Sequence, residues 1–409
     1  MPTAGKHRDL GKVLACWRSA SFLVLRPLTM RTLMNLPEET SEQDIRRNGA
    51  VLTGANKRSL SDIYEVDPLR DPRWQKLLDQ HPQASIFHSV GWLDALHRTY
   101  GYEPVVLTTS PPESSLENGL AFCRIRSWVT GRRLVSLPFS DYCEPLCDGG
   151  EEFESLIGHL HATGIGQPWK YVEIRPRQES LADTMKKLGF GAVGKYTLHR
   201  VDLEPAAEEI FRRVDKHSVQ RRVRRAERTG IVEVCGRSER LLKDFYRLMV
   251  RTRARHNLPP QPYAWFQNLV DCLGEAVELR LAYLKNIPLG AVLILHFKDT
   301  TYYKYGCSDE KFHSLGVMPF LLWRALLRAK AIGSRILDLG RTEDSQSGLI
   351  EFKNHWTPVS SWLTYWKFPA EPFRTSSQDW KLGMVKRICA YMPERLLAGA
   401  GALIYRHIG

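Results

Sequence analysis

Residues 317–341 read VMPFLLWRALLRAKAIGSRILDLGR, and this stretch decides the expected fold. Its first part has the length and apolar content of a helix, Gly333 ends that helix, and an apolar strand pattern containing one acid, Asp338, follows. Residues 151–175, EEFESLIGHLHATGIGQPWKYVEIR, have the same order and carry Glu173 in their strand. Two copies of one helix–strand unit explain the match economically. We therefore expect an α/β protein with two similar domains; a duplicated structural scaffold without chemistry of its own remains the alternative.

The rest of the chain alternates between strand and helix patterns in the manner of α/β proteins. Apolar strand patterns occupy residues 103–109, 119–127, 134–142, 170–176, 279–285, 289–297 and 301–306. We expect a mixed sheet and four parts: a disordered or poorly structured extension at 1–58, a first domain at 59–203, a second domain at 204–368 and a helical tail at 369–409. The two domains should superimpose and meet at a cleft, without one continuous sheet through both.

The composition predicts an anionic partner. Of the 409 residues, 43% are hydrophobic and 25% are charged, which is typical of a globular protein, and the net charge is +13. This surplus suits a nucleotide, tRNA, an anionic lipid or a cell-wall precursor without choosing among them. The 8 cysteines include no paired CxxC spacing, so we expect no metal site and reduced thiols in a cytoplasmic protein.

The first residues do not read as a membrane span. The apolar stretch 13–28 is interrupted by Arg18 and Arg26, whereas a span needs about 20 apolar residues. We expect neither a signal peptide nor an anchor there, and Met30 and Met34 are alternative starts.

The tail has a mixed pattern. One helical face carries Met384, Ile388 and Met392, with basic residues nearby at Lys386, Arg387 and Arg395. We expect this tail to dock on the protein; peripheral contact with the inner face of an anionic membrane is the alternative.

Residues 216–230, KHSVQRRVRRAERTG, predict a basic helix that ends at Gly230. Its apolar residues, Val219, Val223 and Ala226, form one narrow seam. Among the basic residues on the other faces, we expect three to bind the phosphates of a substrate: Arg221, Arg222 and Arg225. A solvated basic face is the alternative. No helix-turn-helix, zinc-finger or RNP pattern accompanies the run, so we do not expect DNA binding.

The alternation in 289–306 and the helix that begins near Gly316 resemble acetyltransferases of the GNAT class. In that class a strand, a glycine-containing loop and a helix N-terminus bind the pyrophosphate of coenzyme A. The loop here, 311-KFHSLGVMP-319, holds a single glycine, and Pro319 suits the first helical turn. A purely structural loop therefore stays open beside a coenzyme A site.

The second half also resembles the FemABX family of aminoacyltransferases, which are built from two GNAT-like domains. The segments that carry the resemblance are 252-TRARHNLPPQP-262, 301-TYYKYGCSD-309, 335-RILDLGR-341 and 349-LIEFKNHW-356. The first half agrees more loosely, through 87-FHSVGW-92, 137-LPFSDY-142 and 170-KYVEIRP-176. The resemblance covers roughly 61–368 and implies two tandem GNAT-like domains.

Acyl transfer from an ester or thioester to an amine passes through a tetrahedral oxyanion, so the site needs a fixed cation and a proton acceptor. Lys353 is the leading cation, because the resembled family has a Phe-Lys motif whose lysine is implicated in acyl transfer. A surface lysine beside a packed Phe352 is the alternative. Asp141, Glu173 and Asp338 could act as the base or could bond a backbone N–H, and we assign Asp141 to catalysis.

At the expected substrate contacts the chain keeps one family residue and departs at others. Tyr305 matches a substrate-contacting tyrosine, whereas Gln261 and Trp265 stand where the family has an arginine and a tyrosine that bind a nucleotide sugar. Asp94 stands where a lysine is expected, and residues 174–177, IRPR, lack the family's aspartate. The resemblance thus implies a retained acyl-transfer apparatus with replaced contacts to UDP-muramyl-pentapeptide.

The implied function is an acyltransferase that moves an aminoacyl or acyl group to an amine on a cell-envelope precursor, of peptidoglycan or exopolysaccharide. Its donor would be aminoacyl-tRNA or acyl-coenzyme A, with no permanently bound cofactor. Two alternatives stay open: an acyl-coenzyme A-dependent N-acetyltransferase of the GNAT class, and a non-catalytic RNA- or phosphate-binding module on a degenerate GNAT fold.

Overall fold

The computed structural model describes residues 62–164, 169–370, 387, 389 and 392–408. All of them belong to one compact unit, Ser59–Gly409. The predicted extension at 1–58, with its apolar stretch and alternative starts, lies outside the described residues, as do Met384 and Ile388 of the tail.

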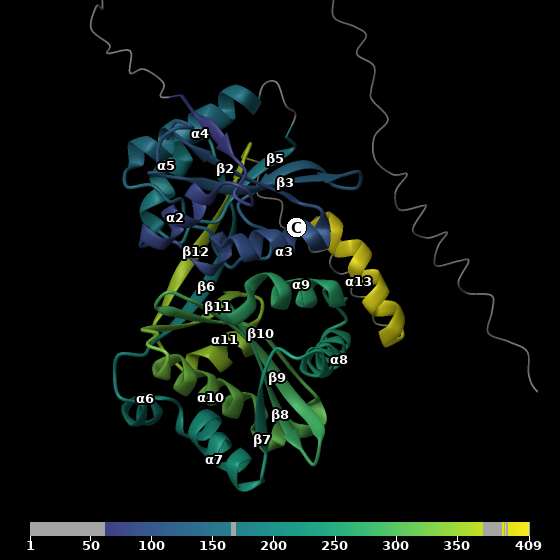
Figure 1. The fold of residues 1–409 in the computed structure, drawn as a ribbon. Coiled ribbons are helices and arrows are strands. Elements are labelled where there is room, and N and C mark those ends of the chain that lie inside the picture. Colours follow the sequence, from purple (N-terminus) through teal and green to yellow (C-terminus); the bar gives the residue numbers. More distant parts are fainter. Residues whose placement is uncertain (1–61, 165–168, 371–386, 388, 390–391, 409) are drawn as a thin grey trace, which may run out of the picture. The chain divides into compact units, whose positions relative to one another are not determined.

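The described strands form one twelve-stranded mixed sheet, in the order β1-β2-β3-β4-β5-β12-β6-β11-β10-β9-β8-β7 (Figure 1). The strands are β1 Tyr64–Val66, β2 Glu103–Thr108, β3 Leu120–Ser127, β4 Gly131–Val135, β5 Tyr171–Ile174, β6 Gly191–Asp202, β7 Val232–Gly236, β8 Val277–Leu284, β9 Ile287–Phe297, β10 Thr300–Ser308, β11 Ile336–Glu343 and β12 Ser360–Phe368. The α-helices are α2 Pro72–Gln80, α3 Val90–Tyr100, α4 Gly150–Gly164, α5 Ala182–Lys187, α6 Ala207–Arg213, α7 Arg221–Arg228, α8 Glu239–Arg255, α9 Tyr263–Leu273, α10 Val317–Ala331, α11 Ser347–Asn354 and α13 Glu394–Ile408. The mixed α/β class predicted from the sequence is confirmed.

The predicted repeat is present as two β–α–β units. Strands β4 and β5 run parallel, with α4 between them in the chain, and β10 and β11 run parallel with α10 between them. A parallel pair needs such a crossover, because its second strand must start again from the same edge of the sheet. The helix–strand order predicted for 151–175 and 317–341 is therefore confirmed.

Two long strands join the halves of the sheet. Strand β12 pairs with β5 of the first half through Trp366 and Ile174, while β6 pairs with β11 of the second half through Asp202 and Ile336. Strands β6 and β12 also pair with each other over most of their length. The expectation that no sheet would continue through both halves is wrong, because the last strand of each half completes the other half. The proposed division at 203/204 stays a prediction.

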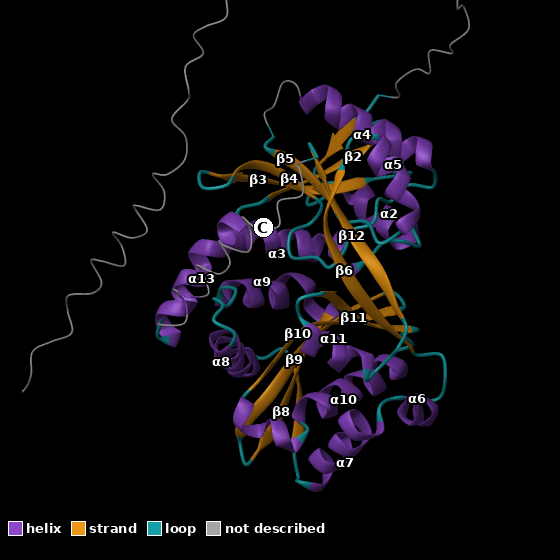
Figure 2. Ribbon diagram, turned by 180° about the vertical axis from the view of Figure 1, so that it is seen from behind, coloured by secondary structure: helices purple, strands orange, loops and turns teal. Residues whose placement is uncertain are grey.

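Helices cover both faces of the sheet (Figure 2). The largest apolar cluster lies under α2, α3, α8 and α9 and reaches from the first half into the second. Within it α3 packs against α9, and the rings of Trp92 and Trp265 meet edge to face at 5.2 Å. Residues of α4 and α5 cover the other face of the first half, and residues of α6, α7 and α10 cover that of the second.

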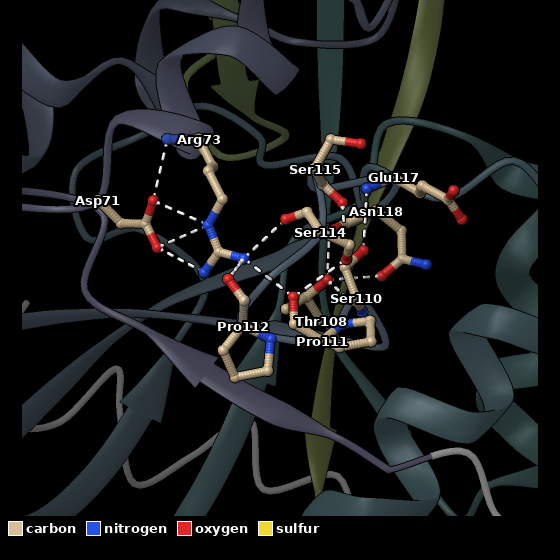
Figure 3. A network of polar contacts seen from close by, with 10 residues as sticks. All are labelled: Asp71, Arg73, Thr108, Ser110, Pro111, Pro112, Ser114, Ser115, Glu117 and Asn118. Carbon is tan, nitrogen blue, oxygen red and sulfur yellow. Dashed lines mark hydrogen bonds and ion pairs between the residues drawn. The ribbon is translucent and has the colours of Figure 1, made fainter.

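The start of α2 shows how local signals fix a connection. The Asp71 carboxylate accepts a hydrogen bond from the backbone N–H of Arg73 at 2.9 Å and so caps the helix. The Arg73 guanidinium then donates to the carbonyls of Pro111, Pro112 and Ser114 at 3.0, 2.7 and 2.8 Å (Figure 3). This one side chain thereby ties the loop between β2 and β3 to α2.

The tail helix α13 docks on the protein, as predicted, and it contacts both halves. It lies against α8 and β3. The Tyr102 hydroxyl donates to the carbonyl of Tyr405 at 2.8 Å, and Arg133 donates to that of His407 at 2.8 Å. In the part of the chain that the structure describes, no helix has the length and apolar composition to cross a membrane.

Candidate active site

A cavity opens where β10 and β11 separate. These parallel strands pair only from Thr300 with Ile336 to Tyr302 with Asp338; beyond that point β10 follows β9, and β11 follows β6. The resulting V borders a cavity of about 1140 Å³. Residues from α7, α8, α10 and α11 line it, together with the loop 139–141 of the first half and Tyr405 of α13. The cavity thus draws on both halves and the tail.

A β-bulge in β10 determines how Tyr303, Lys304 and Tyr305 are placed around this cavity. The register with β9 shifts between Tyr303 and Tyr305, which leaves Lys304 as the extra residue. Tyr303 therefore packs with the α7 and α10 side of the sheet, while Tyr305 packs with the α8 and α9 side. The Lys304 ammonium donates to Asp141 at 2.8 Å and lies 4.8 Å from the centre of the Phe87 ring.

Asp141 belongs to the loop that the first half contributes. Its backbone carbonyl accepts a hydrogen bond from the Tyr365 hydroxyl at 2.7 Å, which holds the loop against β12. Burial opposes ionisation of Asp141, but the adjacent Lys304 ammonium outweighs it and lowers the pKa of the carboxyl. Asp141 is therefore an ionised partner of Lys304 and a weak proton acceptor.

Lys353 lies in the last turn of α11, buried and lining the cavity. Its ammonium donates to the carbonyls of Gly340 at 2.7 Å and of Arg341 at 3.1 Å. Burial lowers the pKa of Lys353 to about 8, against the opposing effect of Asp141. An ammonium has three N–H groups, so these two bonds leave one for another acceptor.

The other two acids considered as bases are held by protein partners. Asp338 accepts hydrogen bonds from the Tyr142 hydroxyl at 2.9 Å and from the backbone N–H of Gly340 at 2.7 Å. Burial, and secondly the charge of Asp141, raise the pKa of Asp338. Glu173 pairs with Arg175 at 2.8 Å. Neither acid lines the cavity.

One wall of the cavity is suited to phosphate. The fifteen-residue helix α10 begins there, after Gly316 in the left-handed conformation, and Pro319 removes one N–H from its first turn. His313 and Arg255 lie beside this turn and both contact Ser308, at 2.8 and 3.4 Å.

The basic helix supplies one of its three predicted residues to that wall. The seam of Val219, Val223 and Ala226 is buried, as predicted. Arg222 lines the cavity, whereas Arg221 and Arg225 are exposed on α7 and are not among the lining residues. The geometry therefore separates Arg222 from its neighbours.

The opposite wall holds the predicted substrate contacts. Gln261 and Tyr305 line the cavity. Trp265 is buried behind them and donates from Nε1 to the Tyr305 hydroxyl at 2.9 Å, so it can orient that hydroxyl without reaching the cavity. Asp94 forms an ion pair with Arg98 at 2.6 Å on α3, away from the lining.

Several lining residues are not predicted from the sequence: Lys304, Arg253, Arg255, His313 and Tyr405. A lysine within the apolar run of β10 was the signal for the first of them. Arg253 forms no ion pair with any other described side chain, although it lies in the same cavity as Tyr305. Among the described residues, no cluster of His, Cys, Asp and Glu is arranged to hold a metal ion.

Comparison with known proteins bears on the fold. Residues 213–354 match the family model described as Acetyltransferase (GNAT) domain. No curated protein matches the chain in sequence. The crystal structure of FemX is similar, with a TM-score of 0.60 at 14% identity over 75% of this chain and 97% of FemX. So is that of a conserved protein of unknown function from Bacteroides thetaiotaomicron, with a TM-score of 0.52 at 10% identity over 75% of this chain and 99% of the other. The chain therefore shares the fold of FemX, and its second half contains the region that matches the acetyltransferase (GNAT) domain model.

Proposed function

We propose that the protein moves an acyl or aminoacyl group from an anionic carrier onto the amine of a cell-envelope precursor, and that this reaction takes place in the cavity between β10 and β11. The observation that carries the proposal is the junction of a phosphate-suited wall with a buried lysine, Lys353, in one cavity. In the reaction the amine nitrogen bonds to the acyl carbon, the carbon–sulfur or carbon–oxygen bond to the carrier breaks, and the amine proton passes to the departing atom.

Lys353 is suited to stabilise the oxyanion of the tetrahedral intermediate. Two of its N–H groups are fixed on backbone carbonyls, so the third has a defined direction before substrate binds. A donor that is already oriented in a water-poor site stabilises developing charge without reorganising. The neutral ion pair of Lys304 and Asp141 contributes a fixed dipole beside it. Since Asp141 is a weak acceptor, we assign the proton transfer to the departing atom of the carrier.

The donor wall favours acyl-coenzyme A. A pyrophosphate would meet the N-terminus of α10, with Arg222, Arg255 and His313 around it. A second carrier, aminoacyl-tRNA, is favoured by one specific feature: the exposed arginines of α7, among them Arg221 and Arg225, lead toward Arg222 and could follow an RNA backbone.

The acceptor wall favours an anionic acceptor. Arg253 lacks an ion-pair partner among the described residues and lies beside the Tyr305 hydroxyl, whose pKa is raised by burial so that it stays a neutral donor. An arginine and a hydroxyl in a cavity suit a carboxylate or a phosphate. Cell-envelope precursors carry both groups, and an N-acetyltransferase acting on a neutral amine would not need this arginine.

The test is binding followed by turnover. Purified protein would be incubated separately with acetyl-coenzyme A and with charged tRNA, and the melting temperature and the consumption of each would be measured. We expect stabilisation by one carrier and its loss in Arg222→Glu. Arg247→Glu, which changes an exposed arginine on α8 outside the cavity, is the matched control. Stabilisation by neither carrier would refute the proposal, and RNA binding without consumption of the charged form would favour a non-catalytic RNA-binding module.

A further inference from the structure

An apolar surface lies at the turn between β3 and β4 and along α13, whose C-terminal end contacts that turn. Trp128 is 85% exposed and Val129 56%, at the tip of the hairpin. On α13, Leu396, Leu403 and Ile408 are 52%, 72% and 52% exposed. A tryptophan this exposed calls for a partner, since most of its ring would otherwise remain in water. We call these five residues the hairpin–tail surface.

The two parts of the hairpin–tail surface are held together. The Trp128 and His407 rings meet edge to face at 5.6 Å, and Ser127 and His407 are hydrogen-bonded at 2.9 Å. Thr130 donates to the carbonyl of His407 at 2.9 Å. Figures 1 and 2 both show the hairpin that begins with β3 extending toward the C-terminal end of α13. The hairpin and the helix can therefore meet one partner at the same time.

The spacing of Leu396 and Leu403 places both residues on an outward face of α13. Leu396 and Leu403 are seven positions apart and so share one face of α13. The side of the helix that faces the protein contains Leu397, which is buried, and Gly401. Gly401 lies so close to the carbonyl of Pro260 that no side chain would fit there. The exposed leucines are not part of that docking contact. This face is separate from the one predicted around Met384 and Ile388, which lies outside the described residues.

Cations surround the hairpin–tail surface. Arg132 follows the hairpin turn, Lys170 lies against it, and Arg406 belongs to α13; all three are exposed. None of these three forms an ion pair within the described residues. Arg126 is also largely exposed and contacts Glu103 at 3.2 Å. Exposed apolar side chains with cations around them suit binding to an anionic bilayer. In such binding the apolar side chains enter the boundary of the acyl chains, and the cations contact lipid phosphates.

We propose that the hairpin–tail surface binds the headgroup region of an anionic membrane, with Trp128, Val129 and Leu403 inserted. Tyr405 of the same helix lines the cavity, so this docking places the cavity next to the bilayer. An acceptor that is tethered to lipid would then reach the site without leaving the membrane. The docking itself does not depend on which reaction the cavity performs.

The test is co-sedimentation of the full chain with vesicles of phosphatidylcholine, with and without about 30 mol % phosphatidylglycerol. We expect binding to the anionic vesicles that falls at least about tenfold in Trp128→Ser/Val129→Ser and roughly fivefold for each of Arg132→Gln and Arg406→Gln. Added salt should weaken binding, because the attraction to lipid phosphates is screened. The matched control is Val359→Ser/Trp362→Ser, which changes another exposed Val–Trp pair, on and just before β12, and should bind as the native chain does.

Three outcomes would overturn the proposal: no binding to anionic vesicles, binding that Trp128→Ser/Val129→Ser does not reduce, or an equal loss in the control pair. Light scattering distinguishes a second copy of the chain as the occupant, because a dimer that disappears in Trp128→Ser/Val129→Ser without vesicle binding would assign the surface to self-association. Donor binding in the same variants should be unchanged, which keeps a failure of membrane docking separate from a failure of the proposed reaction.

Discussion

Replacing Lys353 with methionine tests the chemistry of the cavity with little disturbance of the fold. Methionine keeps the apolar stem and removes the ammonium. The loss leaves the carbonyls of Gly340 and Arg341 without this donor, at a cost of about 1–3 kcal/mol each. Against this, burial lowers the pKa of Lys353 from its ordinary 10.5 to about 8, which corresponds to a penalty of about 3 kcal/mol for the buried ammonium. The two effects largely cancel, so we expect the free energy of unfolding to change by less than about 3 kcal/mol.

The pH dependence of the free energy of unfolding tests the burial penalty assigned to Lys353. Below about pH 8 Lys353 is protonated in both the folded and the unfolded chain, and the full penalty acts. Between about pH 8 and 10.5 the folded chain releases its proton while the unfolded chain keeps it, so the native protein should gain stability as the pH rises through this window. Denaturant unfolding at several pH values should show this gain in the native chain and its absence in Lys353→Met.

The kinetic consequence is larger than the structural one. If the ammonium acts on the oxyanion, kcat should fall on the order of 10²–10³-fold in Lys353→Met, with a small change in KM. Lys330→Met is the matched control, since Lys330 also donates to two backbone carbonyls, those of Leu203 and Pro205, but does not line the cavity. We expect its kcat to be unchanged. An unchanged kcat in Lys353→Met, or an equal fall in the control, would refute the role in stabilising the oxyanion. The lysine would then have only the structural role of linking α11 to β11.

Three further outcomes follow from the geometry. Arg222→Glu should weaken donor binding by at least about tenfold while Arg225→Glu should have little effect, as measured by calorimetry, because only Arg222 lines the cavity. Lys304→Met should destabilise the fold by roughly 3–5 kcal/mol by leaving Asp141 unpaired, and Lys304→Met/Asp141→Asn should recover most of this in thermal melts; a failure to recover would deny that the pair is coupled. Residues 59–203 expressed alone should not give a cooperative melt, since β5 and β6 would lose their partners β12 and β11.

The sequence predicts what is local in this fold. The helix–strand units and the seam of the basic helix rest on neighbouring residues, and both are confirmed. The continuous sheet depends on pairing Ile174 with Trp366, which are far apart in the chain, and no local pattern specifies that pairing. The same contrast holds for the tail, where the contact of Tyr405 with the cavity follows only from tertiary docking.

In the candidate site, too, local sequence features predict some properties, whereas others depend on the tertiary fold. Motif or charge predicts five site residues that the structure brings to one cavity, although their roles stay predictions: Lys353, Asp141, Tyr305, Gln261 and Arg222. The face that Tyr305 occupies departs from strict alternation along β10, which would place it on the same face as Tyr303. A bulge resets the alternation there, and bulges have no reliable signature in a single sequence.

The two halves of the repeat differ at the point where their parallel strands separate, and this difference argues for a single donor site. In the first half the opening is filled by its own chain: Ser136 donates from its N–H to Glu173 at 2.8 Å, and Cys143 donates to Arg175 at 2.7 Å. The loop between these residues carries Asp141 into the cavity of the second half. The second half thus keeps an open V, while the corresponding part of the first half forms a wall of the same site. A calorimetric titration with the donor should therefore give one equivalent per chain, and two equivalents would show that the first half binds donor as well.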